Sequence, residues 1–145
     1  MPAPEVVSAL GVRFGAEAAP LGVTIPAASL LPAMRALRDT YGYRGYVTAS
    51  AIEREAAFEV AHVVRNLDAN DTLFVRVTAP KDLPEIDSLA FVYAGAEWHE
   101  REILDLFGIA FRGHPDPRRI LLPDDYTGHP LRKDFAMDTP WGYRP

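Results

Sequence analysis

The chain has 145 residues, 48% of them hydrophobic and 24% charged, which is enough apolar content for the core of one domain. Its formal net charge of −5 argues against a dedicated nucleic-acid-binding domain, because such domains usually carry a strong basic patch. The chain has no cysteine, which excludes disulfides, thiolate catalysis and thiolate ligands for zinc or iron–sulfur clusters.

The sequence shows neither a membrane span nor a secretory signal. Its apolar runs are only a few residues long, whereas a spanning helix needs about 20. The N-terminus has no basic start and no long apolar stretch. We therefore expect a cytoplasmic protein that reaches a membrane only through a partner.

The first predicted elements lie between residues 21 and 50. Leu21–Pro26 is a short apolar run bounded by glycine and proline, which predicts a strand. A helix follows, with Ser29 as its cap and an exit near Gly42. The next strand is Gly45–Ser50. The apolar stripe of the helix has the three- and four-residue spacing of one helical face, and its members are Leu30, Leu31, Met34 and Leu37.

An antiparallel hairpin is predicted next. Ala57–Leu67 and Thr72–Ala79 alternate in polarity, and the turn residues of "DAND" separate them. His62 falls on the apolar side of the first strand and is interpreted as a hydrogen-bonded sheet histidine. The residues expected to face the core are Phe58, Val60, His62 and Val64 on one strand, and Leu73, Val75 and Val77 on the other.

The segment from Asp87 to Phe107 has a helical pattern, in two pieces broken near Gly95 and stopped at Gly108. The order β-α-β-β-β-α predicts an α+β fold, in which helices pack on one face of a small antiparallel or mixed sheet. An extended, irregular C-terminal tail follows. We divide the chain into an α+β body, residues 1–111, and a partner-docking tail, residues 112–145.

The tail holds six of the 13 prolines. It has six basic and five acidic residues, a net charge of +1, whereas the body carries −6. Such a segment is either disordered or ordered along an extended path by a partner. The apolar cluster Ile120–Leu122 favours ordering by a partner. We expect Arg118, Arg119, Arg132 and Lys133 to pair with acidic groups of that partner, and Asp124, Asp125 and Asp134 with basic ones.

Several polar side chains could be catalytic or metal-binding groups, and each of them also has a structural interpretation. "HEREI" fails the zinc pattern H-E-x-x-H because residue 103 is isoleucine. His114 and His129 could be metal ligands together with Asp124 or Asp125, but we favour turn-capping histidines bonded to the backbone. Glu100, Glu102 and Asp105 are interpreted as a solvated or salt-bridged helix face, in which Arg101 lies one turn from Asp105.

The segment "EWHEREILDLFGIAFRGHPDPRRILLPDDYTGHPLRKDF" resembles the signature of the 30 kDa-type (C-type) subunit of respiratory complex I, the NADH:quinone oxidoreductase. The matching residues include Glu100–Glu102 and Phe107–Ile109, then Gly113–Asp116, Arg118–Leu121 and Gly128–Asp134. Pro117 and His99 depart from the usual pattern. Related subunits of energy-converting [NiFe] hydrogenases and formate hydrogenlyase share this signature and remain the alternative.

The resemblance implies a non-catalytic peripheral-arm subunit that carries no cofactor, catalytic residue or metal. NADH, FMN, iron–sulfur clusters and quinone would bind to other subunits. The expected partners are the large hydrogenase-like (D-type) subunit and the iron–sulfur subunits. A stand-alone metal-dependent enzyme using His114, His129 and Asp124 is the contrasting hypothesis. The residues expected to dock on the partner are Glu100, Arg101, Glu102, His114, Arg118, Arg119, Ile120, Leu121, Leu122, His129, Arg132, Lys133 and Asp134.

Overall fold

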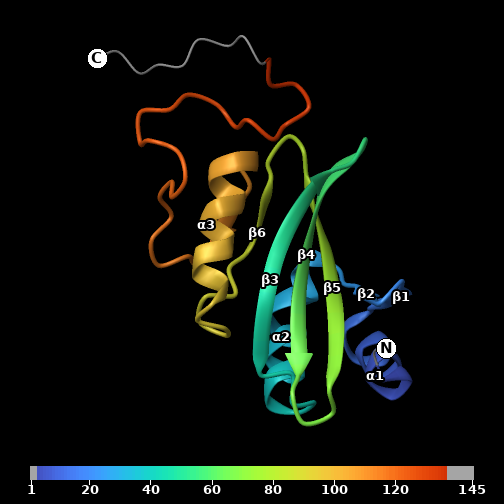
Figure 1. Cartoon of the computed structure of the whole chain (residues 1–145). Helices are drawn as coiled ribbons and strands as arrows, with labels where there is room; N and C mark the ends of the chain where they lie inside the picture. The colour runs from blue at the N-terminus through green and yellow to red at the C-terminus, as the bar shows by residue number, and fades with distance from the viewer. Residues whose placement is uncertain (1–2, 137–145) are drawn as a thin grey trace.

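The computed structural model describes residues 3–136, which form three α-helices and two sheets (Figure 1). This architecture confirms the α+β class. In chain order the elements are α1 (Pro4–Phe14), β1 (Glu17–Ala19), β2 (Gly22–Thr24), the 3-10 turn η1 (Ala27–Ser29), α2 (Leu30–Asp39), β3 (Gly45–Glu53), β4 (Ala57–Asn66), β5 (Asp71–Pro80), β6 (Glu85–Asp87), α3 (Ala96–Phe107) and β7 (Ala110–Arg112).

The main sheet is mixed and has the strand order β1-β2-β5-β4-β3. The pair β2–β5 is parallel, and the other pairs are antiparallel. The predicted hairpin is confirmed as β4–β5, with Ala57 opposite Pro80 and Asn66 opposite Asp71. Its turn places Asn70 at φ 51°, a left-handed conformation that asparagine tolerates better than most residues. The buried residues alternate along both strands as expected.

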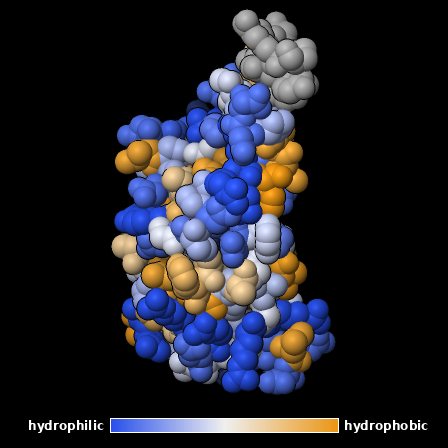
Figure 2. All heavy atoms as spheres, turned by 90° about the vertical axis from the view of Figure 1, so that its left-hand side faces the viewer, coloured by the Kyte–Doolittle hydropathy of each residue, from blue (hydrophilic) through white to orange (hydrophobic). Residues whose placement is uncertain are grey.

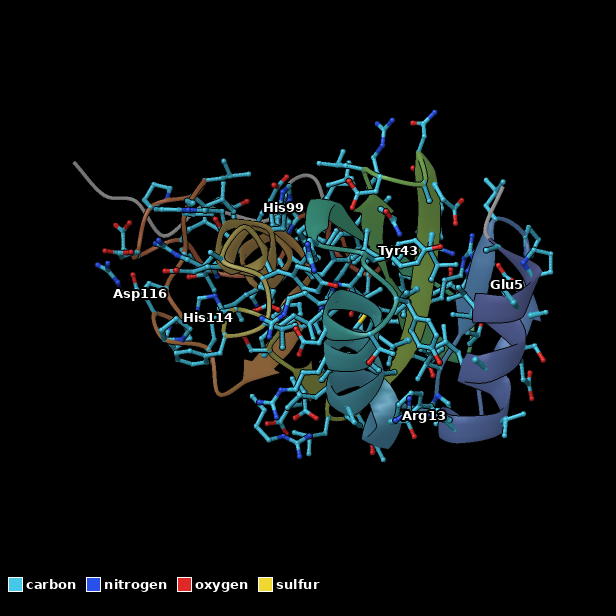
Figure 3. The ribbon with its side chains drawn as sticks, turned by 90° about the horizontal axis from the view of Figure 1, so that it is seen from below. Glu5, Arg13, Tyr43, His99, His114 and Asp116 are labelled. Carbon is cyan, nitrogen blue, oxygen red and sulfur yellow. The ribbon has the colours of Figure 1, made fainter. Side chains whose placement is uncertain are left out.

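The core lies between one face of this sheet and the helices. Seen along the strands, α1 and α2 lie below the sheet, and α3 lies beside β3 (Figure 3). The stripe of α2 is confirmed, because Leu30, Met34 and Leu37 are fully buried. The cap predicted at Ser29 is wrong: this residue precedes the helix, but its side chain makes no capping hydrogen bond. Core packing rather than capping therefore holds α2.

The sequence analysis missed α1 and the short strand β1. Val6 and Leu10, one turn apart, are the buried residues of α1. Its start is tied to the sheet by Asp71, whose carboxylate accepts the amide of Ala3 at 3.1 Å and also the hydroxyl of Tyr43. A tertiary carboxylate therefore fixes the position of a helix whose own apolar stripe is narrow.

The helix predicted over 87–94 is wrong. Asp87 is the last residue of β6, which pairs in parallel with β7, and the residues after it form a turn in which the Leu89 carbonyl accepts the amides of Val92 and Tyr93. Leu89, Val92 and Tyr93 are buried by the turn, so a helical spacing of apolar residues arises without a helix. The stop at Gly108 is confirmed, with φ 71°.

His62 is fully buried, as expected for the core side of β4. Its Nδ1 lies 2.8 Å from the hydroxyl of Tyr46. The expectation that it is fully hydrogen-bonded is wrong within the described part of the chain, because its Nε2 has no partner there. Burial, together with the neighbouring His99, lowers the pKa of His62 to about 3, so this imidazole is neutral at physiological pH.

Candidate partner-docking surface

Helix α3 organises the segment that the sequence analysis singled out. It turns two carboxylates and one guanidinium inward: Glu100 and Asp105 are fully buried, and Arg101 is nearly so. Buried charges are rare unless they are paired or hydrogen-bonded. The expected helix face was solvated or salt-bridged: Glu102 is exposed and Asp105 is salt-bridged to Arg119, but Glu100 and Asp105 are buried rather than solvated. The pairing expected between Arg101 and Asp105 is also absent, since each binds the tail instead.

Asp105 clamps the tail onto the helix. Its Oδ2 accepts the amides of Ile120, Leu121 and Leu122 at 3.1, 2.8 and 2.9 Å, and its Oδ1 accepts a bond from Arg119 at 2.7 Å. Burial by itself would raise the pKa of Asp105. The guanidinium of Arg119 and the three amides outweigh it, so the net pKa is lowered and the carboxylate stays ionised.

Arg101 holds the preceding part of the tail. Its guanidinium donates to the carbonyls of Arg118 and Arg119 at 3.1 and 3.0 Å and lies 3.6 Å from the carboxylate of Asp116. The guanidinium carbon also stands 5.4 Å from the centre of the exposed Trp98 ring. Arg101 therefore binds the carbonyls of residues 118 and 119, and Asp105 binds the amides of residues 120–122. Together they fix the backbone conformation over 118–122.

Glu100 points to the opposite side and fixes the turn before α3. Its carboxylate accepts the Ser88 hydroxyl and the Leu89 amide, both at 2.6 Å, and lies 3.8 Å from Nε2 of His114. Burial raises the pKa of Glu100, against the lowering effect of these hydrogen bonds.

Both Gly-His-Pro histidines bond to the backbone, which confirms the alternative that we favoured. Nδ1 of His114 accepts the Asp116 amide at 3.0 Å, so its Nε2 carries the proton and donates to the Glu97 carbonyl at 3.0 Å. His114 and Asp116 lie close together outside α3 (Figure 3). His129 donates from Nδ1 to the Asp105 carbonyl at 3.0 Å. Within residues 3–136, no three His, Asp or Glu side chains are grouped to hold a metal ion.

The rest of the described tail follows the end of α3. The Leu131 amide donates to the Leu106 carbonyl at 3.0 Å, and Arg132 donates to the Phe107 carbonyl at 2.5 Å. Gly108 makes this approach possible: a Cβ there would lie 2.5 Å from His129 and 2.8 Å from Arg132. The amide of Lys133 reaches Glu53 at the end of β3.

These contacts correct one expectation about the tail. Arg119 and Arg118 were expected to pair with acidic groups of a partner. Within this chain, Arg119 already forms an ion pair with Asp105, and Arg118 forms one with Asp116. Docking itself stays a prediction. Among the predicted docking residues, Glu100 and Arg101 are buried. The half-buried ones are His114, Arg119, Ile120, Leu122, His129 and Arg132, and the exposed ones are Glu102, Arg118, Leu121, Lys133 and Asp134.

Sequence reasoning missed Trp98 and a groove beside α3. Trp98 is 57% exposed, and Leu121 and Leu131 of the tail are 60% and 53% exposed. Figure 2 shows this side of the molecule, where hydrophilic residues occupy the centre and hydrophobic groups flank them. The spacing of Trp98, Glu102 and Leu106, four residues apart, was the available signal, because such residues share one helix face.

No helix in residues 3–136 is both long and apolar enough to cross a membrane.

Comparison with known proteins gives a consistent match. Residues 23–140 match the family described as "Respiratory-chain NADH dehydrogenase, 30 Kd subunit". The chain is 39% identical over 137 residues to the C-type subunit of the NADH-quinone oxidoreductase of Phenylobacterium zucineum (strain HLK1), covering 91% of this chain and 65% of that protein. It is 36% identical over 135 residues to the corresponding subunit of Moorella thermoacetica, covering 92% and 90%. The chain thus spans slightly less than two thirds of the first relative.

Two solved structures share the fold. "Nqo5 of the trypsin-resistant fragment (1-134) in P63 form" superposes with a TM-score of 0.64 at 28% identity, over 77% of this chain and 94% of that one. A chain of the membrane-bound sulfane sulfur reductase, an archaeal respiratory membrane complex, gives a TM-score of 0.80 at 24% identity, over 92% and 85%. At that identity the second likeness concerns the fold alone.

Proposed function

Because the chain belongs to the family of the respiratory-chain NADH dehydrogenase 30 Kd subunit, we propose that it is a non-catalytic peripheral-arm subunit of an NADH:quinone oxidoreductase. In this role it scaffolds the large hydrogenase-like subunit while other subunits transfer electrons from NADH to quinone and the complex translocates protons. NADH, FMN, iron–sulfur clusters and quinone bind to those other subunits. The complex lies on the cytoplasmic side of the cell membrane, and this chain reaches the membrane only through it.

The observation that carries the proposal is the clamp between α3 and the tail. Arg101 and Asp105 bind the backbone of 118–122 and leave the side chains of Arg118 and Leu121 pointing outward, 69% and 60% exposed. A loop that is ordered before binding loses less conformational entropy on docking. Charged and apolar groups on such a loop supply register and anchoring respectively. The clamp thus suits a rigid surface for a protein partner.

The test is co-purification with the large subunit. Arg118→Glu and Leu121→Asp should each weaken the complex by about tenfold or more, since a residue that dominates an interface contributes ~2 kcal/mol or more and ~1.4 kcal/mol is a factor of ten. Circular dichroism should be unchanged, because both side chains are exposed. Leu67→Asp, an exposed leucine in the β4–β5 turn and outside the predicted docking residues, is the control. Equal recovery of the large subunit with all variants would refute the docking role.

The equivalent subunit of an energy-converting [NiFe] hydrogenase or formate hydrogenlyase is the second candidate, since the signature from Glu100 to Asp134 is shared with those complexes. The discriminator lies in the large subunit encoded beside this chain. Cysteine pairs that bind nickel there would favour the hydrogenase assignment, and their absence would favour the NADH:quinone oxidoreductase.

A further inference from the structure

Glu102 is the one acidic residue of "EREILD" that the fold does not use. Glu100 binds the turn at Ser88, and Asp105 binds the tail. Glu102 lies between them on α3, is exposed, and makes no hydrogen bond or ion pair with any residue of 3–136. An acidic side chain in solvent needs no partner, so exposure alone assigns nothing to it.

Glu102 borders a groove on the surface of the chain. The groove runs between α3 and the edge strand β3 and has a volume of about 180 Å³. Its lining residues are Ala49, Ser50 and Ala51 of β3, Ile103, Leu106 and Phe107 of α3, and Leu131 of the tail. Glu102 of α3 also lines it and is exposed, so its carboxylate stands on the rim.

The dimensions and chemistry of the groove suit an apolar side chain. A cavity of ~150 Å³ lined by aliphatic and aromatic groups holds a benzene ring, so this groove has room for a leucine or phenylalanine side chain. Ala49 and Ala51 are small, so they leave room for such a side chain. Leu131 is held at the groove by the hydrogen bond from its amide to the Leu106 carbonyl, at 3.0 Å.

We propose that this groove is a second docking site for the large subunit, and that its occupant is a segment with one bulky apolar side chain for the groove and a lysine or arginine for Glu102. The inference rests on the proposed function. Two properties argue for this occupant. The rim charge is unpaired and negative, and Trp98 lies one turn earlier on the same face, 57% exposed, as a flanking aromatic group. Tryptophan is enriched among residues that dominate binding energy at interfaces.

The test compares binding of purified variants to the large subunit, measured as Kd. Glu102→Arg should weaken binding at least tenfold through charge repulsion, and Ala51→Phe should do so by filling the groove. Leu131→Ser removes an exposed apolar lining residue of the groove and covers the case in which Ala51→Phe does not fold. Glu17→Arg is the matched control: Glu17 is exposed on β1, at the opposite edge of the sheet, and should bind within about twofold of wild type.

The outcomes separate the two proposals. If the wild-type chain does not bind the large subunit, the proposed function fails. If the wild type binds and Glu102→Arg binds equally well, the groove inference is wrong and the function stands. A charge swap adds a positive criterion: a lysine-to-glutamate change on the large subunit should restore binding to Glu102→Arg. If the wild type instead forms dimers that Glu102→Arg dissociates, the occupant is a second copy, which also overturns the inference.

Discussion

Replacing Asp105 with asparagine should release the tail from α3 while leaving the body folded. In the wild type one carboxylate oxygen accepts three consecutive amides, and the other accepts Arg119. Asparagine keeps one neutral oxygen as acceptor, so the hydrogen bonds from the three backbone amides weaken. Its NH₂ group faces Arg119, so the ion pair is replaced by a contact between two hydrogen-bond donors. Hydrogen bonds to a charged group contribute ~1.5–3 kcal/mol each, but bonds that share one group are not additive. We expect a loss of about 3 kcal/mol.

Amide hydrogen exchange measures this loss where it occurs. A change of ~3 kcal/mol should accelerate exchange at Ile120, Leu121 and Leu122 by roughly 100-fold, because each 1.4 kcal/mol is a factor of ten. Amides of β4 and β5 should keep their rates. Glu102→Gln is the control, since it makes the same chemical change three residues earlier at an exposed position. If residues 120–122 exchange at the wild-type rate in Asp105→Asn, the clamp does not hold the tail.

Further predictions concern backbone geometry and pH. Gly108→Ala should cost about 2 kcal/mol more in urea unfolding than Gly113→Ala, because both have positive φ (71° and 81°) but only at Gly108 does the new Cβ meet His129; equal costs would refute the close-contact argument. The pKa of His62 is lowered to about 3 from 6.5, so the unfolded state binds more protons between these values, and stability should fall as pH drops from about 6.5 towards 3. His62→Gln should remove up to ~1.4 kcal/mol per pH unit of that slope. Glu100, whose pKa is raised, acts in the opposite direction in an overlapping range, so the wild type and the variant must be compared at each pH.

Local patterns predicted those elements whose evidence lies within a short stretch of chain. The alternation in 57–79 gave the hairpin, the stripe from Leu30 to Leu37 gave α2, and Gly108 gave the end of α3. The same reasoning failed for 87–94, where the spacing of Leu89, Val92 and Tyr93 is helical although the chain forms a buried turn. It also missed β6 and β7, which are three residues each and pair across more than 20 positions.

Ordering of the tail by a partner stays a prediction, and residues 137–145 of the tail lie outside the described part of the chain. In residues 112–136, bonds from α3 hold the backbone, and the sequence analysis did not anticipate these bonds. Local patterning could not show this, because Asp105 binds backbone amides 15–17 positions away and backbone groups carry no sequence signature. The pattern E-R-E-x-x-D mixes inward and outward residues, and only the structure separates Glu102 from the others.

The clamp also sets a limit on chain length. Asp105 and the amides of 120–122 are joined by a segment that leaves α3, forms β7 and returns to the helix in register. Adding or deleting a single residue in that segment would present a different trio of amides to the carboxylate and rotate Leu121 away from its outward position. The β4–β5 turn at residues 67–70 is held only by local bonds, such as those from the amides of Asp68 and Ala69 to the Asn66 side chain, and all four residues are exposed. It is therefore the better place to insert a label or tag.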